Sequence, residues 1–277
     1  MSVQATVRNN NLCNCGSGQA YDVCCGAMLD EDDIIIHENQ LSAYLGEIGN
    51  RRAEFCRTYT TYKRTALADI VAGINREAQA KGKTIYCHKG CTVCCHVYVV
   101  ASLQECEAIV HYLYQQEAVM RHFVDAFRSW RRCIEVIRDS FFDIGHLQQK
   151  RLSHIDTKDD DKAFSAALLK YTKQNIPCPF LKDGACLIYE VRPYACAGLV
   201  STTPSSWCTA SHPSHKKIVL LRADVNLDSD PPYFANPVSE VFLTNMPALV
   251  YEIIRYGWVF LSRVPGCSHL KNEIGTL

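Results

Sequence analysis

The distribution of cysteines constrains this chain more than any other feature. The sequence holds 16 cysteines in 277 residues, and most stand in short clusters that include the adjacent pairs Cys24–Cys25 and Cys94–Cys95. Adjacent cysteines are poorly suited to separate disulfide staples, and disulfides do not persist in a reducing compartment. The N-terminal segment lacks the apolar core of a secretory signal, so we expect a cytoplasmic protein. Clustered cysteines in that compartment indicate metal binding or redox chemistry.

Charge and hydropathy indicate neither nucleic acid nor a membrane as a partner. Lys plus Arg and Asp plus Glu both total 29, so no global charge favours nucleic acid or an anionic membrane surface. The most apolar stretch, Met246–Val264, is interrupted by Glu252, Arg255 and Arg263. It therefore predicts a buried amphipathic helix instead of a membrane span.

Apolar periodicity predicts a mainly helical chain. A first helix runs from Gln40 to the stop signal at Lys81-Gly82-Lys83, and a second long stretch, with room for a break, starts at the capping box Ser102–Glu105 and extends to Phe141. A charged loop (Lys158–Lys162) is expected to precede a shorter helix.

Three further elements are expected after that loop. They are a helix around Ala163–Lys173, a strand within Lys217–Val225, and a final helix over Val238–Ser262 with a kink at Pro247. The predicted fold class is therefore mainly α. It consists of a helical domain (residues 30–277) stapled by irregular cysteine-rich metal-binding loops, after a small N-terminal zinc knot (residues 1–29).

The N-terminal cluster has the spacing C-x-C-x8-C-C, which offers four thiolates for tetrahedral zinc: Cys13, Cys15, Cys24 and Cys25. Gly16 and Gly18 permit tight folding around the ion, and Tyr21 can cap it. So short a segment has too little apolar core to fold without metal. Residues 12–27 resemble the SEC-C motif, whose fourth ligand is often His in the preprotein translocase ATPase. That resemblance implies zinc binding and a possible protein partner for this segment.

A second set of eight cysteines is divided between two regions: Cys87, Cys91, Cys94 and Cys95, then Cys178, Cys186, Cys196 and Cys208. Asp183-Gly184 is a hairpin-turn signal that would bring Cys178 near Cys186. Pro193 suits the start of a helical turn that would present Cys196 to the same place.

This pattern, C-x3-C-x2-CC followed by CPFL-x-DG-x-C-x-IYE-x-RP-x-x-C, resembles the YkgJ-type cysteine-cluster family. The family is described as a zinc- or iron-chelating domain, and the matching residues extend from Cys87 to Cys208. Ala197 departs from the family pattern, in which an arginine commonly follows the last cysteine of the motif. The resemblance implies a metal site and no defined activity.

Eight thiolates can be divided between metal sites in more than one way. They can form two four-thiolate zinc sites, or one [4Fe–4S] cluster with the remaining cysteines binding zinc or staying free. Such sites carry net negative charge, and the nearby basic residues can either compensate it or simply be solvated. These residues are His88, Lys89, His96, Lys182 and Arg192.

Other uses of the cysteines are weaker. Cys87, Cys91 and Cys94 fit the bare spacing of a radical S-adenosylmethionine cluster, but the long helices leave no room for the strand–helix barrel of such enzymes. His212 and His215 are alternative ligands with a loop position as the simpler explanation. The four remaining cysteines are expected in the core: Cys56, Cys106, Cys133 and Cys267.

Three functions remain open. The first is metal binding with an undetermined biochemical role, which includes a metal carrier or sensor. The second is an iron–sulfur enzyme, because flagellin lysine N-methylase carries a related cysteine-cluster domain. The third is a zinc-stabilised adaptor module. No glycine-rich nucleotide loop supports the enzyme.

Overall fold

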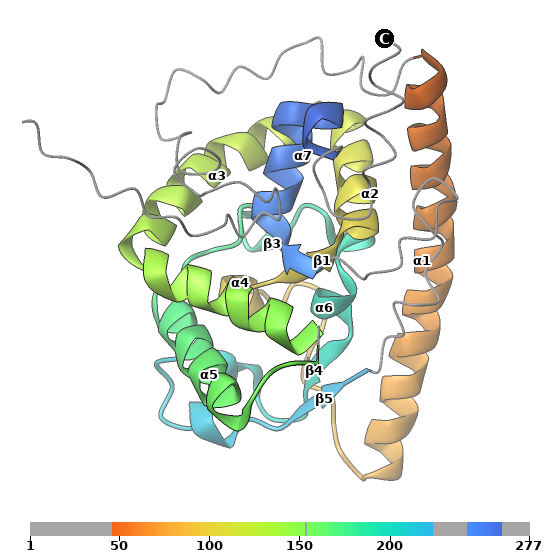
Figure 1. Cartoon of the computed structure of the whole chain (residues 1–277). Helices are drawn as coiled ribbons and strands as arrows, with labels where there is room; N and C mark the ends of the chain where they lie inside the picture. The colour runs from red at the N-terminus through yellow and green to blue at the C-terminus, as the bar shows by residue number, and fades with distance from the viewer. Residues whose placement is uncertain (1–45, 153, 224–242, 262–277) are drawn as a thin grey trace, which may run out of the picture.

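The computed structural model describes residues 46–152, 154–223 and 243–261, and within them the chain is mainly helical, as predicted (Figure 1). The predicted zinc knot at residues 1–29 lies outside the described residues. The helices are α1 (Gly46–Ala80), α2 (Leu103–Tyr114), α3 (Glu117–Val136), α4 (Arg138–Leu152), α5 (Lys158–Lys173), α6 (Tyr194–Ala197) and α7 (Met246–Leu261).

Strands contribute three small antiparallel pairs. β1 (Val100–Ser102) pairs with β6 (Leu243–Asn245), β2 (Leu181–Lys182) with β3 (Ala185–Cys186), and β4 (Leu199–Ser201) with β5 (Leu220–Arg222). β5 confirms a strand within Lys217–Val225. Within the described ranges, four short 3-10 helices lie in the connections: η5 (Val93–His96), η6 (Tyr189–Val191), η7 (Ser205–Cys208) and η8 (His215–Lys217).

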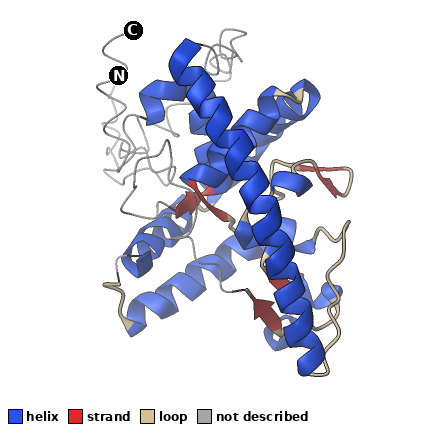
Figure 2. Ribbon diagram, turned by 90° about the vertical axis from the view of Figure 1, so that its right-hand side faces the viewer, coloured by secondary structure: helices blue, strands red, loops and turns tan. Residues whose placement is uncertain are grey.

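Helix α1 runs along one side of the molecule, and Figure 2 shows it crossing in front of the other elements. Its inner face buries Cys56 and Tyr59 in the main core and Ile74 in a smaller cluster with Leu221 of β5. The helix ends before Gly82, as predicted, and Gly82 has a φ of +59° that glycine adopts without steric cost.

The capping box at the start of α2 is present. The Ser102 hydroxyl accepts from the Glu105 N–H (3.2 Å), and the Glu105 carboxylate accepts from the Ser102 N–H (2.9 Å). Beyond it, the long apolar stripe to Phe141 is divided into α2, α3 and the first turn of α4. The interruptions fall at residues 115–116 and at Ile137, without glycine or proline at either place.

An aromatic core joins these helices to the cysteine-rich region. Phe127 of α3 stacks on Tyr251 of α7 with 4.2 Å between ring centroids, and Phe123 stacks on Phe180 at 4.3 Å. Phe180 is fully buried and stands two residues after Cys178. The packed core therefore holds the base of the cysteine-bearing hairpin.

Two local predictions are wrong. Lys158–Lys162 is the first turn of α5 and not a loop, because Thr157 and Asp160 form a second capping box and the carboxylates favour the helix N-terminus. α7 begins at Met246 and not at Val238. Pro247 stands in its first turn, where proline removes no intrahelical hydrogen bond, so it produces no mid-helix kink. Asn245 caps this helix by accepting from the Ala248 N–H (3.1 Å).

None of the helices in the described ranges has both the length and the apolar composition required to cross a membrane.

Candidate metal centre

The segment Cys87–Cys95 folds as a compact turn. The Cys91 N–H donates to the carbonyl of His88 (3.0 Å), and Gly90 between them has a φ of +93°. The chain then enters η5, which contains Cys94 and Cys95. The turn and the 3-10 helix thereby place four thiols within one short loop.

The predicted hairpin at Asp183-Gly184 is confirmed. Both residues have positive φ (48° and 73°), the combination of a type I′ turn, which matches the twist of two antiparallel strands. The register pairs Leu181 with Cys186. The Cys178 N–H donates to the carbonyl of Cys95 (2.7 Å), so backbone hydrogen bonding joins the hairpin to the first cysteine loop.

Cys196 and Cys208 come from two further short elements. Cys196 lies in α6, and its N–H donates to the carbonyl of Pro193 (2.9 Å), which confirms a helical turn at this proline. Cys208 ends η7, which packs against η5 of the first cysteine loop. Four separate pieces of backbone therefore converge on one region.

The charges of these thiols influence one another in two sets. The first set is Cys87, Cys91 and Cys208, since the pKa of Cys87 responds to both of the others. The second set is Cys95, Cys178, Cys186 and Cys196, because Cys178 and Cys186 raise the pKa values of both Cys95 and Cys196. Cys94 acts on both sets, because it contributes to the pKa shift of Cys87 and of Cys178.

Burial dominates the protonation of most of these thiols. It raises the pKa of Cys178 to about 12, and it also raises the pKa values of Cys186 and Cys196. Burial likewise raises the pKa of Cys87, although the Ser201 N–H opposes it by donating to the Cys87 Sγ (3.1 Å). Without metal, burial therefore favours the neutral thiol at Cys87, Cys178, Cys186 and Cys196.

Cys94 and Cys95 differ from the other six. The pKa of Cys94 is lowered to about 6, mainly by a hydrogen bond from the Cys95 thiol; burial opposes this shift, and the Arg192 guanidinium contributes to it. The same shared proton raises the pKa of Cys95. Arg192 also lowers the pKa of Cys186 against the effect of burial. Of the basic residues suggested by sequence, Arg192 thus compensates thiolate charge, whereas the side chains of His88, Lys89 and Lys182 are exposed.

The thiols fit zinc or an iron–sulfur centre in type and number, because both are held by cysteine thiolates in sets of four. Their side chains do not adopt a coordination geometry: across the described ranges, no group of three or more His, Cys, Asp or Glu side chains is arranged to hold a metal ion. All eleven cysteines that the structure describes are free thiols.

A buried ion pair that the sequence did not reveal supports Cys196. Glu105 Oε1 lies 3.0 Å from Lys63 Nζ and accepts the Tyr194 N–H at the start of α6 (2.7 Å). Lys63 also donates to the carbonyl of Val191 (3.4 Å). The available signal was a lysine four residues after Tyr59, on the buried face of α1.

The remaining candidates divide as follows. Cys56 and Cys106 are fully buried, as predicted, whereas Cys133 is exposed on α3, so its assignment to the core is wrong. Cys267 and the four cysteines Cys13, Cys15, Cys24 and Cys25 lie outside the described residues.

The ring nitrogens of His212 and His215 have backbone partners: His212 Nδ1 accepts the Ser214 N–H, and His215 Nδ1 lies 3.1 Å from the carbonyl of Trp207.

Comparisons of this chain with protein-family models, with curated proteins and with solved structures found no match in any of the three.

Proposed function

We propose that this protein binds metal through clustered cysteine thiolates, as zinc or as zinc together with an iron–sulfur cluster. The observation that carries the proposal is the convergence of eight thiols from four separate backbone segments between Cys87 and Cys208. A packed helical domain has no need of so many partly buried thiols for its stability. Their resemblance to the YkgJ-type cysteine-cluster pattern gives independent support.

The electrostatic grouping suggests how the eight ligands would be shared. One four-thiolate site would take Cys94 with the first set, Cys87, Cys91 and Cys208. A second would take the second set, Cys95, Cys178, Cys186 and Cys196. A bound zinc would supply structural cross-linking, and a [4Fe–4S] cluster would supply electron transfer.

The chain's own residues would prepare these sites. The Ser201 N–H and the Arg192 guanidinium stabilise thiolate charge at Cys87 and Cys94. Lys63 and Glu105 fix α6, and with it Cys196, against the helical core. The N-terminal cysteines Cys13, Cys15, Cys24 and Cys25 would form a separate zinc knot of SEC-C type that is available to a protein partner. Twelve of the sixteen cysteines stand in such clusters, which suits a reducing compartment and supports a cytoplasmic location.

Metal analysis of anaerobically purified protein tests this proposal. We expect about three zinc ions per chain if every four-thiolate site takes zinc. Brown protein with iron and acid-labile sulfide would instead assign an iron–sulfur cluster to the eight cysteines between Cys87 and Cys208, as the methylase-like alternative requires. Protein that is free of zinc, iron and sulfide would refute metal binding.

Single substitutions test the ligand sharing. Cys178→Ser and Cys87→Ser should each lose about one metal equivalent, because each removes one of four ligands from a different site. Cys133→Ser is the matched control, since this exposed cysteine lies on α3 away from the two sets. Equal metal content in all three variants and in the wild type would contradict the assignment of these ligands.

A further inference from the structure

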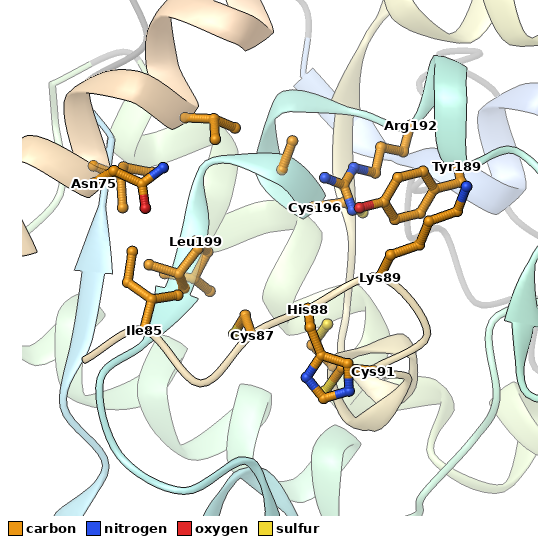
Figure 3. Close-up of a pocket in the computed structure, with 15 residues that line it drawn as sticks. Asn75, Ile85, Cys87, His88, Lys89, Cys91, Tyr189, Arg192, Cys196 and Leu199 are labelled. Atoms are coloured by element: carbon orange, nitrogen blue, oxygen red, sulfur yellow. The ribbon is translucent and has the colours of Figure 1, made fainter.

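A pocket of about 270 Å³ opens beside the cysteine region, between α1, the segment 85–94 and the segment 189–200 (Figure 3). Its volume lies just under the range of about 300–1,000 Å³ that is typical of ligand sites, so it suits a small molecule. The two ends differ in character. Figure 3 shows Ile85, Leu199 and Asn75 at one end and Lys89, Tyr189 and Arg192 at the other, with Cys87 and Cys91 along one side.

The cationic end is built around one aromatic ring. The guanidinium of Arg192 lies 3.9 Å from the centroid of the Tyr189 ring, and Lys89 Nζ lies 5.3 Å from it. Stacking on an aromatic face orients the guanidinium and leaves its N–H donors available at the ring edge. Both cations therefore lie against the same aromatic ring at one end of a small pocket.

These two cations form no ion pair with any carboxylate in the part of the chain that the structure describes. The nearest acidic neighbour in sequence, Glu190, pairs instead with Arg64 of α1 at 3.8 Å. Arg192 acts on the thiols, as described above, but one guanidinium presents five donors and can serve a second anion. The pocket thus combines an apolar wall with two cations that pair with no carboxylate of the described residues.

We propose that this pocket binds a small organic carboxylate. Its carboxylate would accept from Arg192 and Lys89, since the planar guanidinium fork matches the two carboxylate oxygens. Its apolar body would lie against Ile85 and Leu199, with the Asn75 amide as a further polar contact. The ligand would stand next to Cys87 and Cys91. This inference goes beyond metal binding, and it concerns a pocket that four of the proposed metal ligands also line: Cys87, Cys91, Cys94 and Cys196.

Titration calorimetry of the purified protein, with its metal as isolated, tests the proposal with 4-methylpentanoate as the probe. We expect the carboxylate to bind and its neutral analogue 4-methylpentanamide to give no binding. Arg192→Gln should weaken binding by about tenfold or more, the loss expected for a charge-assisted hydrogen bond. Lys89→Gln should weaken it less, because a single ammonium offers no bidentate contact. Arg64→Gln is the matched control and should leave affinity unchanged, since this exposed arginine lies outside the pocket.

Three results would overturn the proposal: no binding of 4-methylpentanoate, equal binding of the amide, or binding of inorganic phosphate alone. The metal content of every variant is measured in parallel, which separates this test from that of metal binding. If Arg192→Gln also loses metal, the test of carboxylate binding rests on Lys89→Gln. A Lys89→Gln variant that has normal metal content and binds the carboxylate with wild-type affinity would refute the site.

Discussion

At the scale of single residues, Glu105 joins the start of α2 to α1 and to α6. One carboxylate oxygen accepts the Ser102 N–H at the start of α2, and the other pairs with Lys63 and accepts the Tyr194 N–H at the start of α6. Both side chains of the ion pair are almost fully buried (2% and 4% exposed). A buried charge that loses its partner is strongly unfavourable, whereas an exposed one is solvated by water.

We therefore expect Glu105→Gln to lower the free energy of unfolding by about 3–5 kcal/mol, because it leaves Lys63 charged and buried without its carboxylate. Glu190→Gln is the control: it removes an exposed carboxylate 3.8 Å from Arg64, and it should change stability by about 0.5 kcal/mol or less. Urea unfolding followed by circular dichroism measures both. If the two variants lose the same stability, the buried pair does not hold α6 in place.

Asp160 offers a test of pH dependence. Its hydrogen bonds from Lys150 (2.8 Å) and then from Thr157 lower its pKa to about 2. A depressed carboxyl pKa stabilises the fold above the unfolded-state pKa of about 3.9, and this stability is lost as pH falls toward about 2. Asp160→Asn should therefore lower Tm at pH 7, and the difference from wild type should shrink between pH 4 and pH 2.

Thermal unfolding of Asp159→Asn provides the control for that series, because the Asp159 side chain is 92% exposed. We expect its Tm to follow that of the wild type at every pH. A wild-type advantage over Asp160→Asn that stays constant down to pH 2 would contradict the lowered pKa.

At the scale of elements, short turns place the cysteines, and the helices hold those turns. The β2–β3 hairpin has a two-residue turn with both residues at positive φ. Its base is fixed by Phe180 stacked on Phe123 of α3 and by the hydrogen bond from the Cys178 N–H to Cys95. The turn conformation consequently controls where Cys186 stands relative to Cys178.

Gly184→Ala should destabilise the protein by about 1–2 kcal/mol, because an alanine at a φ of +73° is strained even though no atom lies near the added Cβ. Gly73→Ala is the matched control in the middle of α1, where the nearest atom to the new Cβ is a flexible Arg76 nitrogen at 3.9 Å. This change should stabilise the protein by up to about 1 kcal/mol, since alanine favours helix. Equilibrium unfolding measures the free energy of unfolding of both variants. A Gly184→Ala variant as stable as the wild type would contradict the role of the turn.

At the scale of the whole molecule, the helical core and the cysteine region are distinct in composition. The main core is built from α1, α2, α3, α4, α5 and α7, and its aromatic stacks include no proposed ligand. Cys178, Cys186 and Cys196 only pack against its edge. Metal would therefore stabilise the cysteine loops more than the helices.

Chelation under reducing conditions should accordingly lower the Tm of the purified protein while most of the far-UV circular dichroism of the helices persists at 25 °C. Full recovery of Tm on return of the metal would show that the loops refold around it. Complete loss of the helical signal on chelation would contradict a core that is independent of metal. An unchanged Tm would instead show that metal contributes no stability to the fold.

The features that the sequence predicted correctly are local ones. The end of α1 before Gly82, the capping box at Ser102 and Glu105, and the hairpin turn at Asp183-Gly184 each depend on a few neighbouring residues with strong conformational preferences. The errors at Lys158–Lys162, Pro247 and Cys133 arose because each residue type was interpreted without its position in the helix. A run of charges can begin a helix, a proline in the first turn does not kink it, and a cysteine on the exposed face is not part of the core.

By itself the sequence predicted a mainly helical protein, which the structure confirms, and it indicated eight cysteines between Cys87 and Cys208 as candidate ligands, because helix periodicity and turn chemistry are properties of short segments. Only the tertiary structure showed which of those thiols raise one another's pKa values, that Cys94 contributes to the pKa of both Cys87 and Cys178, and that Lys63 and Glu105 hold α6. It alone also brought Lys89 and Arg192 together at one pocket. These contacts join residues that are distant in the chain, and packing of the whole core fixes them, so no local pattern encodes them.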